Sequence, residues 1–170
     1  MKRILVVDDD LAVLKQVSAY LADDYEVSLA KSGNLALQVC VREKPDLILL
    51  DIEMTDTDSF DIMSQLKRNP YLDRIPVIFL AAQHSAEVEI HALEAGARDF
   101  IVKPVEKSIL LHRIELHLRF ISYQVQTEQT VMSLSDSIAT SFAEMIECRD
   151  ESTGGHVYAL QNMLIFWAKD

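Results

Sequence analysis

Residues 3–10 read RILVVDDD, a short and largely apolar run that ends in three aspartates. Apolar side chains at helical spacing follow over residues 11–21, so this opening predicts a strand, an acidic loop and a helix. A further run, DLILL at residues 46–50, ends at another aspartate, Asp51. Strands that deliver carboxylates at their carboxyl ends predict a polar site beyond one edge of a parallel sheet.

The alternation of strand and helix continues through the first part of the chain. Further strands are predicted at residues 26–30, 77–81 and 99–102, and further helices at 34–43, 58–67 and 85–95, the last ending before Gly96. Short apolar strands separated by helices of about three turns are typical of a parallel sheet covered on both faces. The predicted fold class is α/β, a doubly wound five-stranded parallel sheet with a long C-terminal helical extension.

The composition is that of an ordinary globular protein with an acidic surface. Of 170 residues, 49% are hydrophobic and 25% are charged, and the formal net charge is −11. Nucleic acids and anionic membranes are bound through clusters of Lys and Arg, which are scattered here, so no such partner is expected. No run approaches the roughly 18 apolar residues of a membrane-spanning helix, and a cytoplasmic location is expected. Cys40 and Cys148 are expected to be unpaired thiols.

The predicted strands bring chemically active residues to one edge of the sheet. The first strand delivers Asp8, Asp9 and Asp10, the third Asp51, the fourth Ala81 and the fifth Lys103. Carboxylates this close repel one another unless a hard cation lies among them, and Mg²⁺ prefers oxygen ligands. A metal beside a lysine also suits phosphoryl transfer to a carboxylate. The alternative, in which an aspartate only caps the first helix, is favoured for Asp10.

Four segments in this order resemble the response-regulator receiver family: VVDDD at 6–10, LLD at 49–51, PVIFLAA at 76–82 and KP at 103–104. The resemblance covers residues 1–120 and implies a flavodoxin-like receiver domain. It implies that Asp51 accepts a phosphoryl group from a histidine kinase or a phosphotransfer protein. The implied contacts are Mg²⁺ with Asp8, Asp9, Asp51 and the backbone carbonyl of Glu53, and the phosphoryl group with Lys103.

Two switch positions of that family differ in how well they match. Ala81 stands where the family carries Ser or Thr, so no hydroxyl is available to a phosphoryl oxygen. A hydrogen bond to a charged group contributes roughly 1.5–3 kcal/mol, and a weaker switch is therefore expected. Phe100 occupies the aromatic switch position, although a strand phenylalanine is equally consistent with ordinary core. After Asp51 the family's proline and glycine are missing, and Asp56 and Asp58 are expected in a solvated helix-capping region.

A long helical region is predicted after Pro104, because neither Pro nor Gly occurs between residues 105 and 153. Apolar or small residues there follow the heptad rhythm of a coiled coil, which Glu128 and Ser135 interrupt. The positions are 111, 114, 118, 121, 125, 132, 139, 142 and 146. Residues 121–146 are therefore predicted to be a coiled-coil linker helix that forms a homodimer. A helix that packs only on its own domain is the alternative.

The segment EMIECRDESTGGHVYAL at 144–160 resembles the opening of the HD-GYP phosphodiesterase domain, which hydrolyses cyclic di-GMP at a metal centre. The matching residues are Glu147, Arg149, Asp150, Thr153, Gly154 and His156. The resemblance implies that residues 147–170 begin such an output domain, with His156 as a metal ligand or active-site residue. Neither the HD pair nor the GYP triplet follows, so we expect the N-terminal part of a longer protein, without enzymatic activity of its own.

These features predict a signalling module rather than an enzyme. A Mg²⁺-dependent receiver accepts a phosphoryl group and controls a cyclic di-GMP phosphodiesterase output domain that this chain does not contain. The alternative is a receiver-like dimerisation scaffold that works without phosphorylation. The absence of a hydroxyl at Ala81 favours this alternative.

Overall fold

The computed structural model describes residues 1–55, 57–83 and 85–150, with side chains up to residue 145. The chain divides into two units, Met1–Ile121 and Ser122–Asp170. Among the described helices, none has an apolar segment long enough to cross a membrane.

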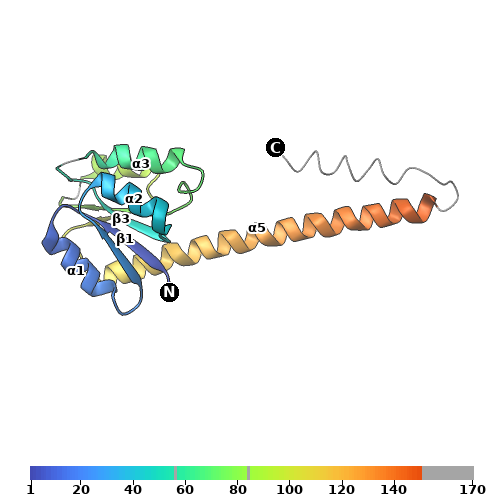
Figure 1. The fold of residues 1–170 in the computed structure, drawn as a ribbon, viewed down its shortest axis with the longest axis horizontal. Coiled ribbons are helices and arrows are strands. Elements are labelled where there is room, and N and C mark those ends of the chain that lie inside the picture. Colours follow the sequence, from blue (N-terminus) through green and yellow to red (C-terminus); the bar gives the residue numbers. More distant parts are fainter. Residues whose placement is uncertain (56, 84, 151–170) are drawn as a thin grey trace. The chain divides into compact units, whose positions relative to one another are not determined.

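Strands and helices alternate along the described chain (Figure 1). The strands are β1 (Arg3–Val7), β2 (Glu26–Ala30), β3 (Leu47–Asp51), β4 (Val77–Ala81) and β5 (Asp99–Val102). The helices are α1 (Leu11–Leu21), α2 (Gly33–Glu43), α3 (Ser59–Arg68), α4 (Ala86–Glu94) and α5 (Lys107–Asp150). The predicted α/β fold with a long C-terminal helix is confirmed. The predicted strands and the four shorter helices have bounds within one residue of those observed.

The five strands form one parallel sheet in the order β2-β1-β3-β4-β5. The strand order reverses beside β1, which lies between β2 and β3. Val7 of β1 pairs with Leu50 of β3, so the next residues, Asp8 and Asp51, continue from neighbouring positions at the carboxyl edge. This is the place where ligands bind in doubly wound sheets.

Helices cover both faces of the sheet, and alternate strand residues enter two separate cores (Figure 1). Leu5 and Val7 pack with residues of α2, α3 and α4, whereas Ile4 and Val6 pack with α1 and the first turns of α5. All residues of β3 and β4 are buried, as expected for central strands covered on both sides. Since each buried aliphatic side chain contributes roughly 1.5–3 kcal/mol, the two cores fix the ends of the central strands.

Local sequence signals set the helix ends. Asp10, Ser32 and Asp58 accept hydrogen bonds from backbone N–H groups in the first turns of α1, α2 and α3. These caps satisfy donors that a helix N-terminus leaves without a partner. The predicted capping roles of Asp10 and Asp58 are confirmed, whereas Asp56 lies outside the described residues. Gly96, with φ of +97°, follows α4 where a left-handed backbone is needed.

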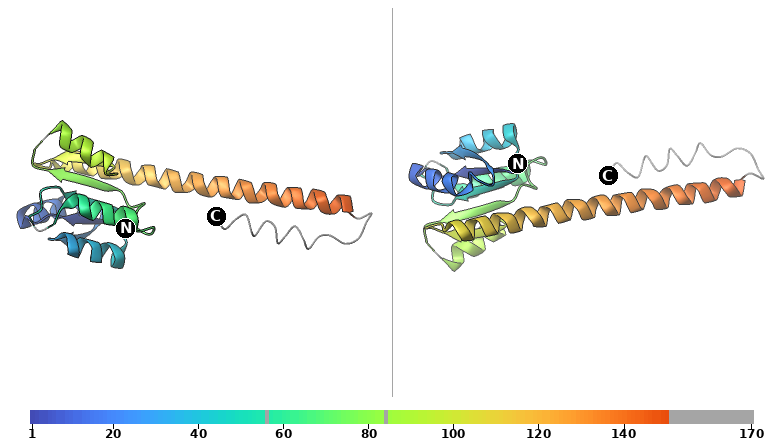
Figure 2. Two further views of the ribbon diagram at one scale, coloured as in Figure 1. Left: turned by 90° about the horizontal axis from the view of Figure 1, so that it is seen from above. Right: turned by 90° about the horizontal axis from the view of Figure 1, so that it is seen from below.

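The helix α5 begins on the sheet and extends into the second unit. Leu110 and Ile114 are fully buried in the core that α5 shares with α1. The helix continues without a break to Asp150 (Figure 2). Large apolar side chains are exposed along the part that lies in the second unit, beginning with Tyr123 at 60%.

Candidate functional site

The carboxyl edge of the sheet gathers three carboxylates and one ammonium group. Asp51 ends β3, Asp8 and Asp9 follow β1, and Lys103 follows β5. One oxygen of each of the three carboxylates lies within 4.8 Å of the others. Lys103 Nζ lies 2.7 Å from Asp8 Oδ2 and 2.8 Å from Asp51 Oδ1. The structure thus brings together the four side chains that were predicted to meet at one edge of the sheet.

Burial governs the electrostatics of this cluster, because Asp8 is 0% and Asp51 is 2% exposed. Burial raises the pKa of Asp8, since the charged form loses water, while hydrogen bonds from Lys103 and the Asp10 backbone oppose the shift. For Lys103, burial favours a lower pKa, but the contacts with Asp51 and Asp8 outweigh it and raise the pKa. The Lys103 ammonium is therefore the counter-charge of two buried carboxylates.

The third carboxylate, Asp9, is held by the loop that follows β3. Its Oδ2 accepts hydrogen bonds from the backbone N–H of Thr55 at 2.9 Å and from the Thr55 hydroxyl at 2.7 Å. These two bonds lower the pKa of Asp9 because they favour its charged form. Sequence reasoning missed Thr55, and no spacing or motif signals this contact.

The remaining predicted residues lie around the cluster. The carboxylate of Glu53 accepts a hydrogen bond from the backbone N–H of Ala82 at 3.0 Å. Ala81 is 2% exposed, and its carbonyl accepts a hydrogen bond from the backbone N–H of Lys103 at 2.7 Å. Phe100 is 6% exposed and packs in the core between the sheet and α2–α4. Its position in this structure is that of an ordinary core residue.

The cluster fits a hard divalent cation. Asp51 Oδ1 is buried and accepts no hydrogen bond from the described residues, although Lys103 forms an ion pair with it. Within the described part of the chain, Lys103 is the one cation that this cluster provides for two buried carboxylates, so a further positive group among them is favourable. Oxygen atoms of Asp8, Asp9 and Asp51 could supply the ligands that Mg²⁺ prefers.

A second charged cluster, which sequence reasoning missed, lies at the start of β5. Asp99 Oδ1 is 2.6 Å from Arg113 Nη1, and Asp99 Oδ2 is 2.9 Å from His117 Nε2. Burial favours a higher pKa for Asp99, but hydrogen bonds from Arg113 and His117 outweigh it and lower the pKa. The cluster ties α5 to the sheet. The four-residue spacing of Arg113 and His117, which places both on one side of a helix, is the signal that could have found it.

Several sequence predictions fall outside what the structure describes. His156, the candidate output-domain residue, lies outside the described residues, and the side chain of Cys148 does too. Cys40 is a free thiol, as predicted, and its burial raises its pKa to about 12. A thiol with this pKa stays protonated at neutral pH and is not a nucleophile.

The fold and the acidic edge define a receiver-type domain of two-component signalling. The chain belongs to the response regulator receiver domain family, whose family model matches residues 4–115. The predicted receiver is thereby confirmed. A domain of this family is not itself catalytic.

Two curated relatives match the receiver, and one of them also matches the chain beyond it. The chain is 32% identical over 173 residues to a probable cyclic di-GMP phosphodiesterase of Vibrio cholerae serotype O1, covering 94% of this chain and 39% of the relative. It is 41% identical over 119 residues to the response regulator PleD of Caulobacter vibrioides, covering 69% of this chain and 26% of the relative. The chain therefore spans less than half the length of these two relatives.

Solved structures show the same fold. A CheY-like receiver domain protein of Methanospirillum hungatei JF-1 has a TM-score of 0.68 at 30% identity, covering 73% of this chain and 98% of that chain. The BeF3-activated N-terminal receiver domain of Klebsiella pneumoniae RstA has a TM-score of 0.64 at 36% identity. This match covers 69% of this chain and 99% of the RstA domain. These similarities confirm the predicted flavodoxin-like receiver fold.

Proposed function

We propose that Asp51 is the phospho-acceptor of a Mg²⁺-dependent receiver and that a histidine kinase or phosphotransfer protein is the donor. The observation that carries this proposal is the position of Lys103 Nζ, 2.7 Å from Asp8 and 2.8 Å from Asp51. A cation fixed beside a carboxylate nucleophile can neutralise charge on the transferring oxygens. Membership of the receiver family supports the same chemistry.

Each residue of the cluster has a separate part in the proposed transfer. A carboxylate oxygen of Asp51 forms a bond to phosphorus while the bond between phosphorus and the donor's leaving group breaks. Asp8, Asp9, Asp51 and the backbone carbonyl of Glu53 would hold Mg²⁺, which when bound neutralises charge on the phosphoryl oxygens. Lys103 compensates the buried charge of Asp8 before transfer and contacts the phosphoryl group afterwards.

Ala81 and Phe100 are the proposed switch positions. Ala81 ends β4 beside the strand that carries Asp51, so its side chain is next to the acceptor edge but has no hydrogen-bond donor. Phe100 is packed in the core. We infer that phosphorylation shifts the conformation less than it would with a hydroxyl at position 81.

The proposed organisation is a receiver at residues 1–120, a linker helix at 121–146 and the start of an HD-GYP-like output domain at 147–170. The match to the Vibrio cholerae protein supports it, because that match covers 94% of this chain, whereas the receiver family ends at residue 115. That relative is a probable cyclic di-GMP phosphodiesterase, which supports cyclic di-GMP hydrolysis as the output under control. His156 would then belong to the metal site of the complete output domain.

The proposal is tested by the intact mass of the chain after incubation with acetyl phosphate, with and without Mg²⁺. The unchanged protein is expected to gain one phosphoryl group in the presence of Mg²⁺ only, and Asp51→Asn is expected to gain none. Asp61→Asn, which removes an exposed carboxylate from α3, serves as the control and should be labelled normally. Normal labelling of Asp51→Asn would contradict the assignment.

Absence of labelling in every variant would instead favour a dimerisation scaffold that works without phosphorylation. Ala81 is the residue that favours this second function, because it offers no hydroxyl with which to sense a phosphoryl group.

A further inference from the structure

One side of α5 in the second unit carries exposed apolar side chains with an eleven-residue period. Tyr123, Leu134 and Met145 follow one another at this spacing, and Val131 and Phe142 repeat it. The full set, called here the apolar stripe, is Tyr123, Thr127, Val131, Leu134, Ile138, Phe142 and Met145. Each apolar member is 56–61% exposed. Since eleven residues span three helical turns, all members stay on one side of a straight helix.

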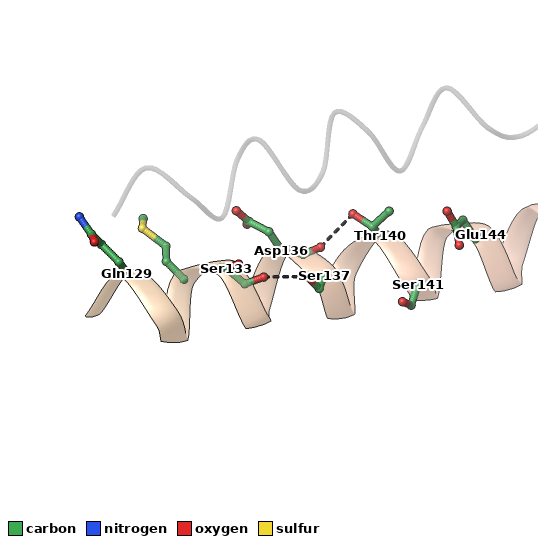
Figure 3. A pocket seen from close by; sticks show the side chains of 8 residues that line it. Gln129, Ser133, Asp136, Ser137, Thr140, Ser141 and Glu144 are labelled. Carbon is green, nitrogen blue, oxygen red and sulfur yellow. Dashed lines mark hydrogen bonds between the residues drawn. The ribbon is translucent and has the colours of Figure 1, made fainter. Parts of the chain in front are cut away.

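The predicted heptad positions follow a different path along the same helix. They pass through Glu128 and Ser135, and through Met132, which lines a hollow together with Gln129 and Asp136 (Figure 3). The described residues that line this hollow all come from α5 and are mostly polar. A heptad line drifts by about 20° per repeat around a straight helix and so crosses from one side to another. The apolar stripe is therefore the continuous apolar surface.

This part of α5 has a composition that does not favour an isolated helix. Seven of the 16 residues from 127 to 142 are Ser or Thr, which compete with the helical backbone for hydrogen bonds. Four of these hydroxyls donate to the carbonyl four residues earlier, those of Thr127, Thr130, Ser137 and Thr140. A helix of this kind gains most of its stability by burying its apolar side. The stripe therefore needs a partner.

We propose that the apolar stripe is covered by the same stripe of a second copy of this chain. The acidic residues Glu128, Asp136 and Glu144 lie roughly 100° or more around the helix from the centre of the stripe. The residues that border the stripe are uncharged, namely Gln124, Thr130, Ser135 and Ser141. Two copies can thus meet without bringing carboxylates together. An uncharged border offers no electrostatic complementarity to a charged partner protein.

Two hydroxyl groups, one in the stripe and one on its border, fit a dry contact. Thr127, the polar member of the stripe, donates its hydroxyl to the Tyr123 carbonyl at 2.8 Å, and Thr130 donates to Gln126 at 2.9 Å. Because these donors are already satisfied, burying them costs little. The methyl group of Thr127 remains available for packing.

The exposed apolar area is large enough for a specific dimer. Each of the six apolar members exposes on the order of 100 Å², so two copies would bury up to about 1,200 Å² through these side chains. This value lies at the lower end of specific protein interfaces. The same spacing continues back in the sequence to Phe120 and Leu116, which are 50% and 55% exposed. The pairing needs no phosphoryl group, so it stands whether or not Asp51 is an acceptor.

The test is sedimentation equilibrium of the full chain without a phosphoryl donor. The unchanged chain is expected to be a dimer, and Val131→Gln combined with Ile138→Gln is expected to weaken association at least tenfold. The matched control is Met132→Gln combined with Ala139→Gln, which changes two heptad positions and should leave association unchanged. Glutamine keeps good helix propensity in both pairs. A monomeric unchanged chain, or a dimer weakened only by the control pair, overturns the proposal.

Disulfide cross-linking separates a lost contact from a lost helix. In a Cys148→Ser background, oxidised Leu134→Cys is expected to form covalent dimers, because position 134 lies at the middle of the stripe. Asp136→Cys, on the polar side, should stay largely monomeric. Efficient cross-linking at 136 with none at 134 would place the contact on the other side of α5 and overturn the proposal.

Discussion

Lys103 is the residue on which the charge balance of the acidic pocket depends. Its ammonium meets Asp8 at 2.7 Å and Asp51 at 2.8 Å, and both carboxylates are almost completely buried. Removing an ion from water costs several kcal/mol unless it is paired. With Asp9, three carboxylates and one ammonium leave two negative charges in the cluster. A divalent cation carries the charge that would cancel them.

Asp8→Asn is expected to stabilise the metal-free protein at neutral pH. Burial raises the pKa of Asp8 in the folded state. An acid with a raised folded pKa contributes stability that is complete below its unfolded pKa and lost as the pH rises through its folded pKa. Asparagine avoids that loss, so the free energy of unfolding should rise by on the order of 1 kcal/mol at pH 7. The gain should disappear below about pH 4.

Urea denaturation in EDTA at both pH values measures this effect, and Asp9→Asn is the matched control. The pKa of Asp9 is lowered by its bonds from Thr55, so its contribution has the opposite sign and is lost as the pH falls. Asp9→Asn should therefore destabilise the protein at pH 7. A loss of stability in Asp8→Asn at pH 7 would show that pairing with Lys103 outweighs the cost of burial.

Ala81→Ser is expected to enlarge the response to phosphorylation. Position 81 is 2% exposed, so a serine hydroxyl there would be buried and would cost about 1–3 kcal/mol without an acceptor. A phosphoryl group on Asp51 would provide that acceptor. The variant should have a lower Tm than the unchanged protein without phosphorylation and a larger gain in Tm with acetyl phosphate and Mg²⁺. Equal gains in both proteins would show that the hydroxyl does not reach the phosphoryl group.

At the scale of elements, the strands that carry the site could be predicted and the loop contacts could not. β3 and β4 are apolar runs, and parallel strands align their carboxyl ends, so the gathering of Asp8 and Asp51 at one edge of the sheet could be predicted. Their direct adjacency depends on the strand order, which the structure supplied. The contacts of Thr55 with Asp9 and of Glu53 with the Ala82 amide depend on loop backbone angles. No periodic pattern in a sequence records those angles. The loop after Asp51 is also where this sequence lacks the proline and the glycine of the receiver family.

Asp99→Asn is expected to lower the free energy of unfolding by about 1 kcal/mol, because it removes the ion pair that attaches α5 to β5. The expected change is small because Arg113 is 42% exposed and solvent screens the pair. The pKa of Asp99 is lowered, so its stabilisation is present above the unfolded pKa and is lost as the pH falls through the folded pKa. Urea denaturation should show the full difference from the unchanged protein at pH 7. The difference should shrink below about pH 4. A difference that persists unchanged in acid would assign the effect to packing rather than to charge.

At the scale of the whole molecule, the proposed phosphoryl acceptance and the proposed pairing of two copies are assigned to different units. The candidate acceptor residues and both apolar cores lie within Met1–Ile121, and the apolar stripe lies within Ser122–Asp170. The sequence could indicate this division, because the strand pattern ends at residue 102 and an uninterrupted helical pattern follows. It did not indicate which side of α5 is left uncovered, because the heptad and eleven-residue patterns share Phe142. Exposure does not separate the two patterns, since Met132 of the heptad path is 72% exposed; they differ in that Glu128 and Ser135 interrupt the heptad path.

A chain shortened to residues 1–121 is expected to fold and to accept a phosphoryl group but not to pair. Among the described residues, the fully buried members of both cores end at Ile114 and the site ends at Lys103, so a chain that ends at Ile121 keeps all of them. Its free energy of unfolding should stay within about 1 kcal/mol of that of the full chain, because both described apolar cores lie in the part that is kept. The intact mass should rise with acetyl phosphate and Mg²⁺, whereas sedimentation should show a monomer. If the short chain folds but takes no label while the full chain does, the second unit must complete the acceptor site, and the assignment of that site to the four residues of the sheet edge fails.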